Sequence, residues 1–116
     1  MTQFRSRADF GSYIRTNSYS TERLGAVVGR ALVVLFKRQT AAEQAQNNAV
    51  NTNNIGFSKG DSKCGCITAK YYIKNKKLED WMIERWLNCN ERGEMRITKY
   101  WRQISEAIQE KASQNS

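Results

Sequence analysis

Basic side chains recur at helical spacing in two segments of this sequence. Near the C-terminus, at about 100° per residue, Arg96, Lys99 and Arg102 fall opposite the apolar residues of the same segment. In an earlier segment the same spacing aligns Lys70 and Lys74. Backbone phosphates of nucleic acids are bound by several cations held close together, and unpaired bases stack on exposed aromatic rings. The sequence predicts one surface for nucleic acid or an acidic partner, made of Lys70, Lys74, Lys76, Lys77, Arg92, Arg96, Lys99, Arg102 and the aromatic Tyr72.

A charged helix face also has a simpler explanation. A charged side opposite an apolar stripe is typical of any surface helix, and Glu106 and Glu110 continue the C-terminal segment. A merely solvated face, or contact with an acidic protein, therefore stays open beside nucleic acid.

The large aromatic residues are interpreted mainly as core. They recur at helical spacing among Ile, Leu and Met, and buried rings stabilise a small helical domain. Of the adjacent pair Tyr71 and Tyr72, one side chain is expected to be exposed, because neighbouring residues cannot both face inward. The expected core residues are Trp81, Trp86, Ile97, Tyr100, Trp101 and Ile104.

The three cysteines offer a weak metal signal. Cys64, Cys66 and Cys89, with Asp61 as a fourth ligand, have the donor types of a zinc site. Zinc sites usually space paired cysteines by two to four residues, and helical residues at i and i+2 point in different directions. Reduced, mostly buried thiols are therefore favoured, and no metal or cofactor is expected.

Catalysis is not expected either. The chain has no histidine, which removes the commonest general base and metal ligand. The carboxylate pairs Asp80/Glu84 and Glu106/Glu110 stand at the spacing of a divalent-metal site, but such pairs are common on exposed helices. No glycine-rich phosphate loop or nucleophile elbow accompanies them. The sequence predicts a protein that is not an enzyme.

Composition fits one basic domain. The 116 residues include 19 Lys and Arg against 11 Asp and Glu, for a net charge of +8, which points to acidic partners. Residues 1–46 and 47–116 each carry +4. The most apolar run, residues 24–36, is too short for a membrane span. Three cysteines cannot all pair within one chain, so a reducing cytoplasm fits best.

The elements that must position these residues are all helical. We expect a flexible basic arm over 1–20, a long helix over 21–46, an Asn- and Gly-rich linker over 47–60, and a compact three-helix unit over 61–112. Together they make an all-α single domain of about four helices. The middle of the long helix is apolar on nearly every side, which indicates central burial or a homodimer. The three helices of the C-terminal unit are expected at 61–75, 79–89 and 94–112.

The C-terminal half contains a recognisable set of residues: Gly56-Phe57-Ser58-Lys59-Gly60-Asp61-Ser62, Ala69-Lys70-Tyr71-Tyr72, Leu78, Trp86 and Arg96-Ile97-x-Lys99-Tyr100-Trp101-Arg102-Gln103-Ile104. In this pattern the chain, over about residues 54–108, resembles a short helical module of small phage and mobile-element proteins that also occurs in some helicase-like proteins. The module has no settled activity, so the resemblance implies a nucleic-acid context and no catalytic residue. Its usual Thr-x-x-Gln capping sequence is replaced here by Glu79-Asp80-Trp81-Met82.

Two functions are compatible with these observations. The first is a non-enzymatic nucleic-acid-binding accessory protein, encoded by a phage or mobile element and acting in the cytoplasm of a bacterial host. The second is a phage-encoded inhibitor of a host defence or repair complex, similar to anti-CRISPR proteins, that acts by protein contact.

Overall fold

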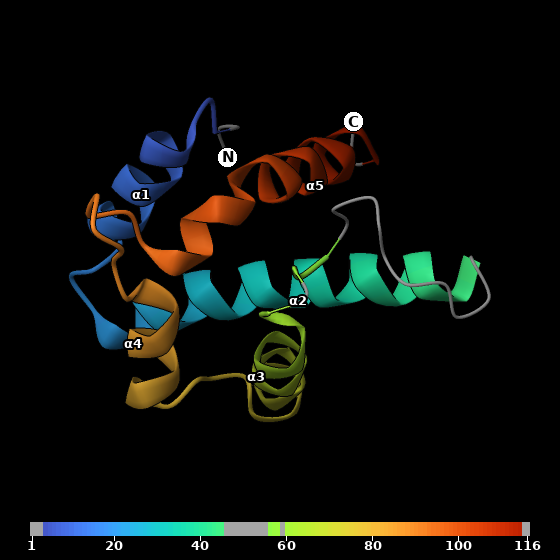
Figure 1. Ribbon diagram of the computed structural model, residues 1–116, viewed down its shortest axis with the longest axis horizontal. Coiled ribbons are helices and arrows are strands. Elements are labelled where there is room, and N and C mark those ends of the chain that lie inside the picture. The colour runs from blue at the N-terminus through green and yellow to red at the C-terminus, as the bar shows by residue number, and fades with distance from the viewer. Residues whose placement is uncertain (1–3, 46–55, 59, 115–116) are drawn as a thin grey trace.

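The computed structural model, which describes residues 4–45, 56–58 and 60–114, consists of helices joined by turns and loops (Figure 1). No strand occurs in these residues, so the all-α prediction is confirmed, with five α-helices and one 3₁₀ helix where about four helices were expected. No helix among them is long and apolar enough to span a membrane. The elements are α1 (Arg7–Thr16), α2 (Thr21–Ala45), α3 (Ser62–Asn75), α4 (Asp80–Leu87), η1 (Arg96–Tyr100) and α5 (Trp101–Gln114).

Helix α2 is the central element of the fold. It contacts α3, α4 and α5, while α1 packs against η1 and α5. Figure 1 shows α3 and α5 on opposite sides of α2. The sequence predicted that the three C-terminal helices form a compact unit of their own. In the structure they do not, because α3 packs mainly on α2.

The apolar character of α2 is explained by these contacts. Val28, Leu32 and Leu35 are fully buried. The apolar residues on the flanks of the helix, Val33 and Phe36 among them, are partly buried against the same core. The apolar surface of α2, which suggested a homodimer, is thus covered by other helices of the same chain.

The N-terminal segment is not a flexible arm. It contains α1, and Phe4, Phe10 and Ile14 are buried in the core. The Phe4 backbone N–H donates to Ser105 Oγ of α5 at 3.1 Å, and that hydroxyl donates to the Phe4 carbonyl at 3.2 Å. Only two of these three apolar residues lie in the ten-residue helix α1, which is too short a pattern to read from sequence. The prediction of a flexible arm was therefore wrong.

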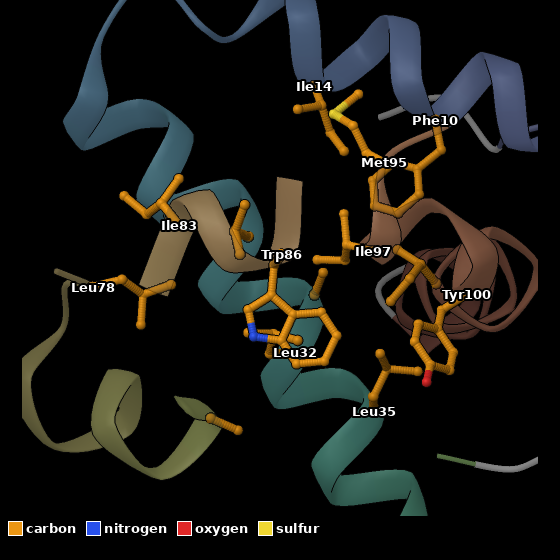
Figure 2. Close-up of a cluster of buried hydrophobic side chains, with 14 of the residues drawn as sticks. Phe10, Ile14, Leu32, Leu35, Leu78, Ile83, Trp86, Met95, Ile97 and Tyr100 are labelled. Atoms are coloured by element: carbon orange, nitrogen blue, oxygen red, sulfur yellow. The ribbon is translucent and has the colours of Figure 1, made fainter. Parts of the chain in front are cut away.

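The core lies between α1, α2, α4 and η1. Trp86 is fully buried, and Figure 2 shows its indole among side chains of α2 and η1. Of the six expected core residues, four are buried, Trp101 is half-buried and Trp81 is 52% exposed. Trp81 was assigned wrongly because α4 has only eight residues and turns its Met82, Ile83 and Trp86 side inward.

The expected helix boundaries agree best for α2 and α3. The helix expected at 94–112 is interrupted, because residues 96–100 form the 3₁₀ helix η1 before α5 begins. A backbone bridge between Cys89 and Met95 closes the preceding turn, in which Gly93 has φ +77°. The expected linker over 47–60 lies mostly outside the described residues.

Candidate nucleic-acid interface

Two of the predicted phosphate-binding residues, Arg96 and Lys99, turn toward Asp61. Asp61 precedes α3 and is only 3% exposed. Arg96 donates to its Oδ1 from both Nε, at 3.0 Å, and Nη2, while Lys99 Nζ lies 2.5 Å from Oδ2. The Tyr100 hydroxyl donates to the same Oδ2 at 2.5 Å. One buried carboxylate thus ties the start of α3 to η1.

These contacts fix the charge states of the cluster. Burial alone would raise the pKa of Asp61, but hydrogen bonds from Lys99, Tyr100 and Arg96 outweigh it and lower the pKa to about 2. Burial and the hydrogen bond to the carboxylate raise the pKa of Tyr100 to about 12. At neutral pH the cluster therefore holds one anion and two cations, which leaves a single uncompensated positive charge.

Arg96 has a second structural contact. Its guanidinium lies 4.8 Å from the ring centroid of the buried Trp86 and so covers the core. Arg96 is half-buried, and its position is set by a carboxylate and an aromatic ring of this chain. It is therefore less available to an external phosphate than a residue of a free basic face.

The motif residues of the C-terminal half contact one another across the same junction. The Gly56 N–H donates to Gln103 Oε1 at 2.7 Å, and Gln103 Nε2 donates to the Gly56 carbonyl at 3.0 Å. Gly56 has φ +81°, and a Cβ there would lie 2.4 Å from Gln39 Cβ, so only glycine fits. The Phe57 and Tyr100 rings meet edge to face at 5.9 Å. The spacing of these residues thus has a structural role.

Arg92 and Arg102 are exposed but lie on other parts of the surface. Arg92 belongs to the turn before η1, where its N–H donates to Asn90 Oδ1 at 2.9 Å. The Arg102 guanidinium lies 5.3 Å from the centroid of the half-buried Trp101 on α5. Neither residue is on α3.

The remaining predicted lysines lie along α3 and just beyond its end. Lys70, Lys74, Lys76 and Lys77 are all exposed, and Lys76 ends the helix in a left-handed conformation with φ +59°. They extend toward the end of α3 away from Asp61, which at 1.5 Å per residue lies about 20 Å from its start. The structure therefore separates these four lysines from Arg96 and Lys99, which lie beside the start of α3.

Lys63 was missed from the sequence. It stands seven residues before Lys70 and eleven before Lys74, so all three lie on one face of α3, with the exposed Ile67 among them. The helical spacing that selected Lys70 and Lys74 also selects Lys63. None of these three lysines forms an ion pair within the described part of the chain.

The basic surface extends onto α2. Arg23, Arg30 and Lys37 recur every seven residues along the exposed side of this helix. The Lys70 ammonium lies 5.7 Å from the Phe36 ring centroid of α2, so it bridges the two helices. We call the exposed basic residues of both helices, together with the two lysines that follow α3, the α2–α3 surface: Arg23, Arg30, Lys37, Lys63, Lys70, Lys74, Lys76 and Lys77.

The charge of the protein is segregated by segment. Residues 23–42 contain four basic residues, residues 62–78 contain five, and neither segment contains an acidic residue. Residues 79–95 contain five acidic and two basic residues. Residues 1–46 and 47–116 have equal net charge, which does not show this segregation, because basic and acidic segments alternate along the chain.

Tyr72 does not occupy the position expected of a stacking ring. It is half-buried between α3 and α2, where a Cβ at Gly29 would lie 2.2 Å from its Cδ1. Its neighbour Tyr71 is also half-buried, so the expectation that one of the two is exposed was wrong. Tyr72 fills a space that depends on glycine in the facing helix.

The groups considered for metal binding are dispersed or occupied. Cys64, Cys66 and Cys89 are free thiols, and no group of three potential metal-ligating side chains gathers in the described residues. Glu106 pairs with Arg38 at 3.2 Å, and the side chain of Glu110 lies outside the described part of the structure.

In comparisons with known proteins, no family model, curated protein or solved structure matches the chain.

Proposed function

We propose that this chain is a small non-enzymatic nucleic-acid-binding accessory protein that binds phosphates through the α2–α3 surface. The observation that supports this is the segregation of charge: residues 23–42 and 62–78, which span most of α2 and all of α3 with the three residues after it, contain nine basic residues and no acidic residue. Eight of the nine belong to the α2–α3 surface, and the two acidic residues of α2, Glu22 and Glu43, lie near its ends. A solvated helix face has no need to exclude acidic residues, whereas a phosphate-binding face does.

The mechanism is charge neutralisation with little reading of base identity. Lysine ammonium groups on α3 replace the counterions condensed on the nucleic acid, and their release drives binding. The lysines suit this role because they are exposed and free of ion pairs among the described residues. Arg96 and Lys99 contribute less, because Asp61 compensates part of their charge.

The biological setting is also part of the proposal. The resemblance of residues 54–108 supports an origin in a phage or mobile element. The free thiols support a reducing compartment, which is the cytoplasm of a bacterial host. No catalytic step is proposed, because Asp61, the most buried carboxylate of the described residues, already accepts hydrogen bonds from three side chains.

A binding titration at two salt concentrations tests this function. Fluorescent single-stranded DNA, hairpin duplex DNA and single-stranded RNA of equal length are titrated with the protein. We expect affinity in the micromolar range or tighter that falls as salt rises.

Two triple variants locate the surface. Lys63→Gln, Lys70→Gln and Lys74→Gln together are expected to flatten the salt dependence by about two units of log–log slope. The matched control, Arg15→Gln with Arg92→Gln and Arg102→Gln, removes the same charge from exposed residues outside α2, α3 and α4 and is expected to change the slope little. Equal effects of the two triple variants would contradict the assigned surface. Absence of binding at low salt would overturn the function and favour an acidic protein as the partner.

A further inference from the structure

We propose that Trp81 is a base-stacking residue and that the ligand of the α2–α3 surface is single-stranded nucleic acid. This inference rests on the proposed function and names its substrate class. The inference is based on the indole of Trp81, which is not buried in the core.

Trp81 is a large apolar side chain held in place at the surface. It is 52% exposed, while its Nε1 donates to Glu79 Oε2 at 2.5 Å. The other oxygen of Glu79 accepts a hydrogen bond from the Tyr71 hydroxyl at 3.2 Å. Glu79 makes no side-chain capping bond to α4, so its carboxylate serves to join these two rings. The polar edge of the indole is thereby satisfied, and the exposed part of the ring is oriented.

The indole of Trp81 lies near the lysines at the C-terminal end of α3. Tyr71 lies on α3 one turn before Lys74, and residues three apart on a helix are neighbours. Lys76 and Lys77 follow α3 directly and lead toward Glu79. Through the shared carboxylate, Trp81 therefore stands near the C-terminal end of the α3 lysines. A strand whose phosphates follow α3 reaches this ring with its bases.

The surrounding acidic residues orient such a strand. Asp80 and Glu84 are exposed on α4, beside Trp81. They repel phosphates, so the backbone stays on the α3 side while a neutral base extends over the indole. An arrangement of cations along one side and an aromatic ring on the other is typical of surfaces that bind single strands.

Only a nucleic acid with unpaired bases can stack on Trp81. In a duplex, both faces of an internal base are covered by neighbouring pairs, so an indole on the protein surface has no free face to stack on. In a single strand the bases can unstack and cover the ring. The lysines act on both forms, whereas Trp81 acts only on the single strand.

Trp81→Ala tests the proposal directly. We expect the affinity for a single-stranded oligothymidylate to fall about tenfold, with the affinity for a blunt-ended duplex of two separate strands unchanged. The triple lysine variant is expected to weaken both. Thermal unfolding of each variant, followed by circular dichroism, verifies that the fold is kept.

A spectroscopic readout covers the case in which Trp81→Ala disturbs the fold. Stacking of a base quenches indole fluorescence, and Trp86 is buried while Trp101 is half-buried. Oligothymidylate is expected to quench the fluorescence of the natural protein, and Trp81→Phe is expected to lose most of this quenching. If the lysine variant loses binding while Trp81→Ala and Trp81→Phe behave as the natural protein, the stacking role is wrong and the function stands. If no nucleic acid binds at all, the proposed function itself fails.

Discussion

The Tyr100 hydroxyl donates a hydrogen bond of 2.5 Å to the carboxylate of Asp61, 39 residues earlier in the chain. Through this bond the start of α3 is joined to the end of η1. Arg96 and Lys99 complete the surroundings of the same carboxylate. A buried charge with three side-chain donors stabilises a fold only while all of its partners remain.

Asp61→Asn is therefore expected to destabilise the protein. Removing one member of a buried charge cluster costs about 3 kcal/mol, and the partial exposure of Arg96 and Lys99 keeps the effect at the low end of the usual range. Tyr100→Phe, which removes one donor to a charged group, is expected to cost about 1.5 kcal/mol. Urea unfolding monitored by circular dichroism measures both. An Asp61→Asn variant as stable as the natural protein would show that the cluster contributes nothing.

The same carboxylate predicts a pH dependence of stability. The pKa of Asp61 is lowered in the folded protein to about 2, below its ordinary value of 3.8. Its contribution is therefore complete above about pH 4 and is lost as the pH falls toward 2, because protonation then favours the unfolded chain. Urea unfolding at steps between pH 5 and pH 2 should show a loss of about 2 kcal/mol that is absent in Asp61→Asn. Parallel curves for the two proteins would rule out this assignment.

Arg96 and Lys99 show why one part of the candidate site could not be read from the sequence. A continuous α-helix over 94–112 would place them on an outer face with Arg102. In the 3₁₀ helix η1, residues three apart eclipse each other, so both point to one side and reach Asp61. That carboxylate lies 35 residues from Arg96, and no local period records such a contact.

Periodicity succeeded where a helix is long and one-sided. The spacing of the α3 lysines was sufficient to place Lys70 and Lys74 on an exposed face, and it would have included Lys63. Trp81 and the residues of α1 were misplaced because those helices are short, so the direction of their inner side depends on packing with distant elements.

Phe10→Ala tests whether α1 belongs to the folded core. Phe10 is 1% exposed and stacks on Phe4 with ring centroids 4.6 Å apart. Truncating such a ring removes apolar contacts and leaves a cavity, with an expected cost of about 3–4 kcal/mol. The control Tyr19→Ala, at a side chain 79% exposed, should change the free energy of unfolding by less than about 0.5 kcal/mol. Equal stabilities of the two variants would mean that the N-terminal segment does not pack as described.

Gly29→Ala tests the close approach of α2 and α3. A Cβ at this position would lie 2.2 Å from Tyr72 Cδ1, so the helices must separate or the ring must move, at an expected cost of about 1–3 kcal/mol. Gly60→Ala is the matched control, because nothing lies within 4 Å of a Cβ at Gly60. In a double-mutant cycle, Tyr72→Ala should remove most of the penalty of Gly29→Ala, and additive effects would contradict this contact.

Arg96→Gln should mainly lower stability, whereas Lys70→Gln should mainly reduce the salt dependence of nucleic-acid binding. Arg96 supports Asp61 and covers Trp86, so its loss is expected to cost about 2 kcal/mol of stability while the salt dependence of nucleic-acid binding changes little. Lys70 is exposed and forms no ion pair in the described residues. Its loss should leave stability within about 0.5 kcal/mol and flatten the salt slope by about 0.7–0.9. Urea unfolding measures the free energy of unfolding of each variant, and titration at several salt concentrations measures the salt slope of each. If Arg96→Gln flattens the slope as much as Lys70→Gln does, phosphate contacts reach the Asp61 cluster and the interface extends beyond the α2–α3 surface.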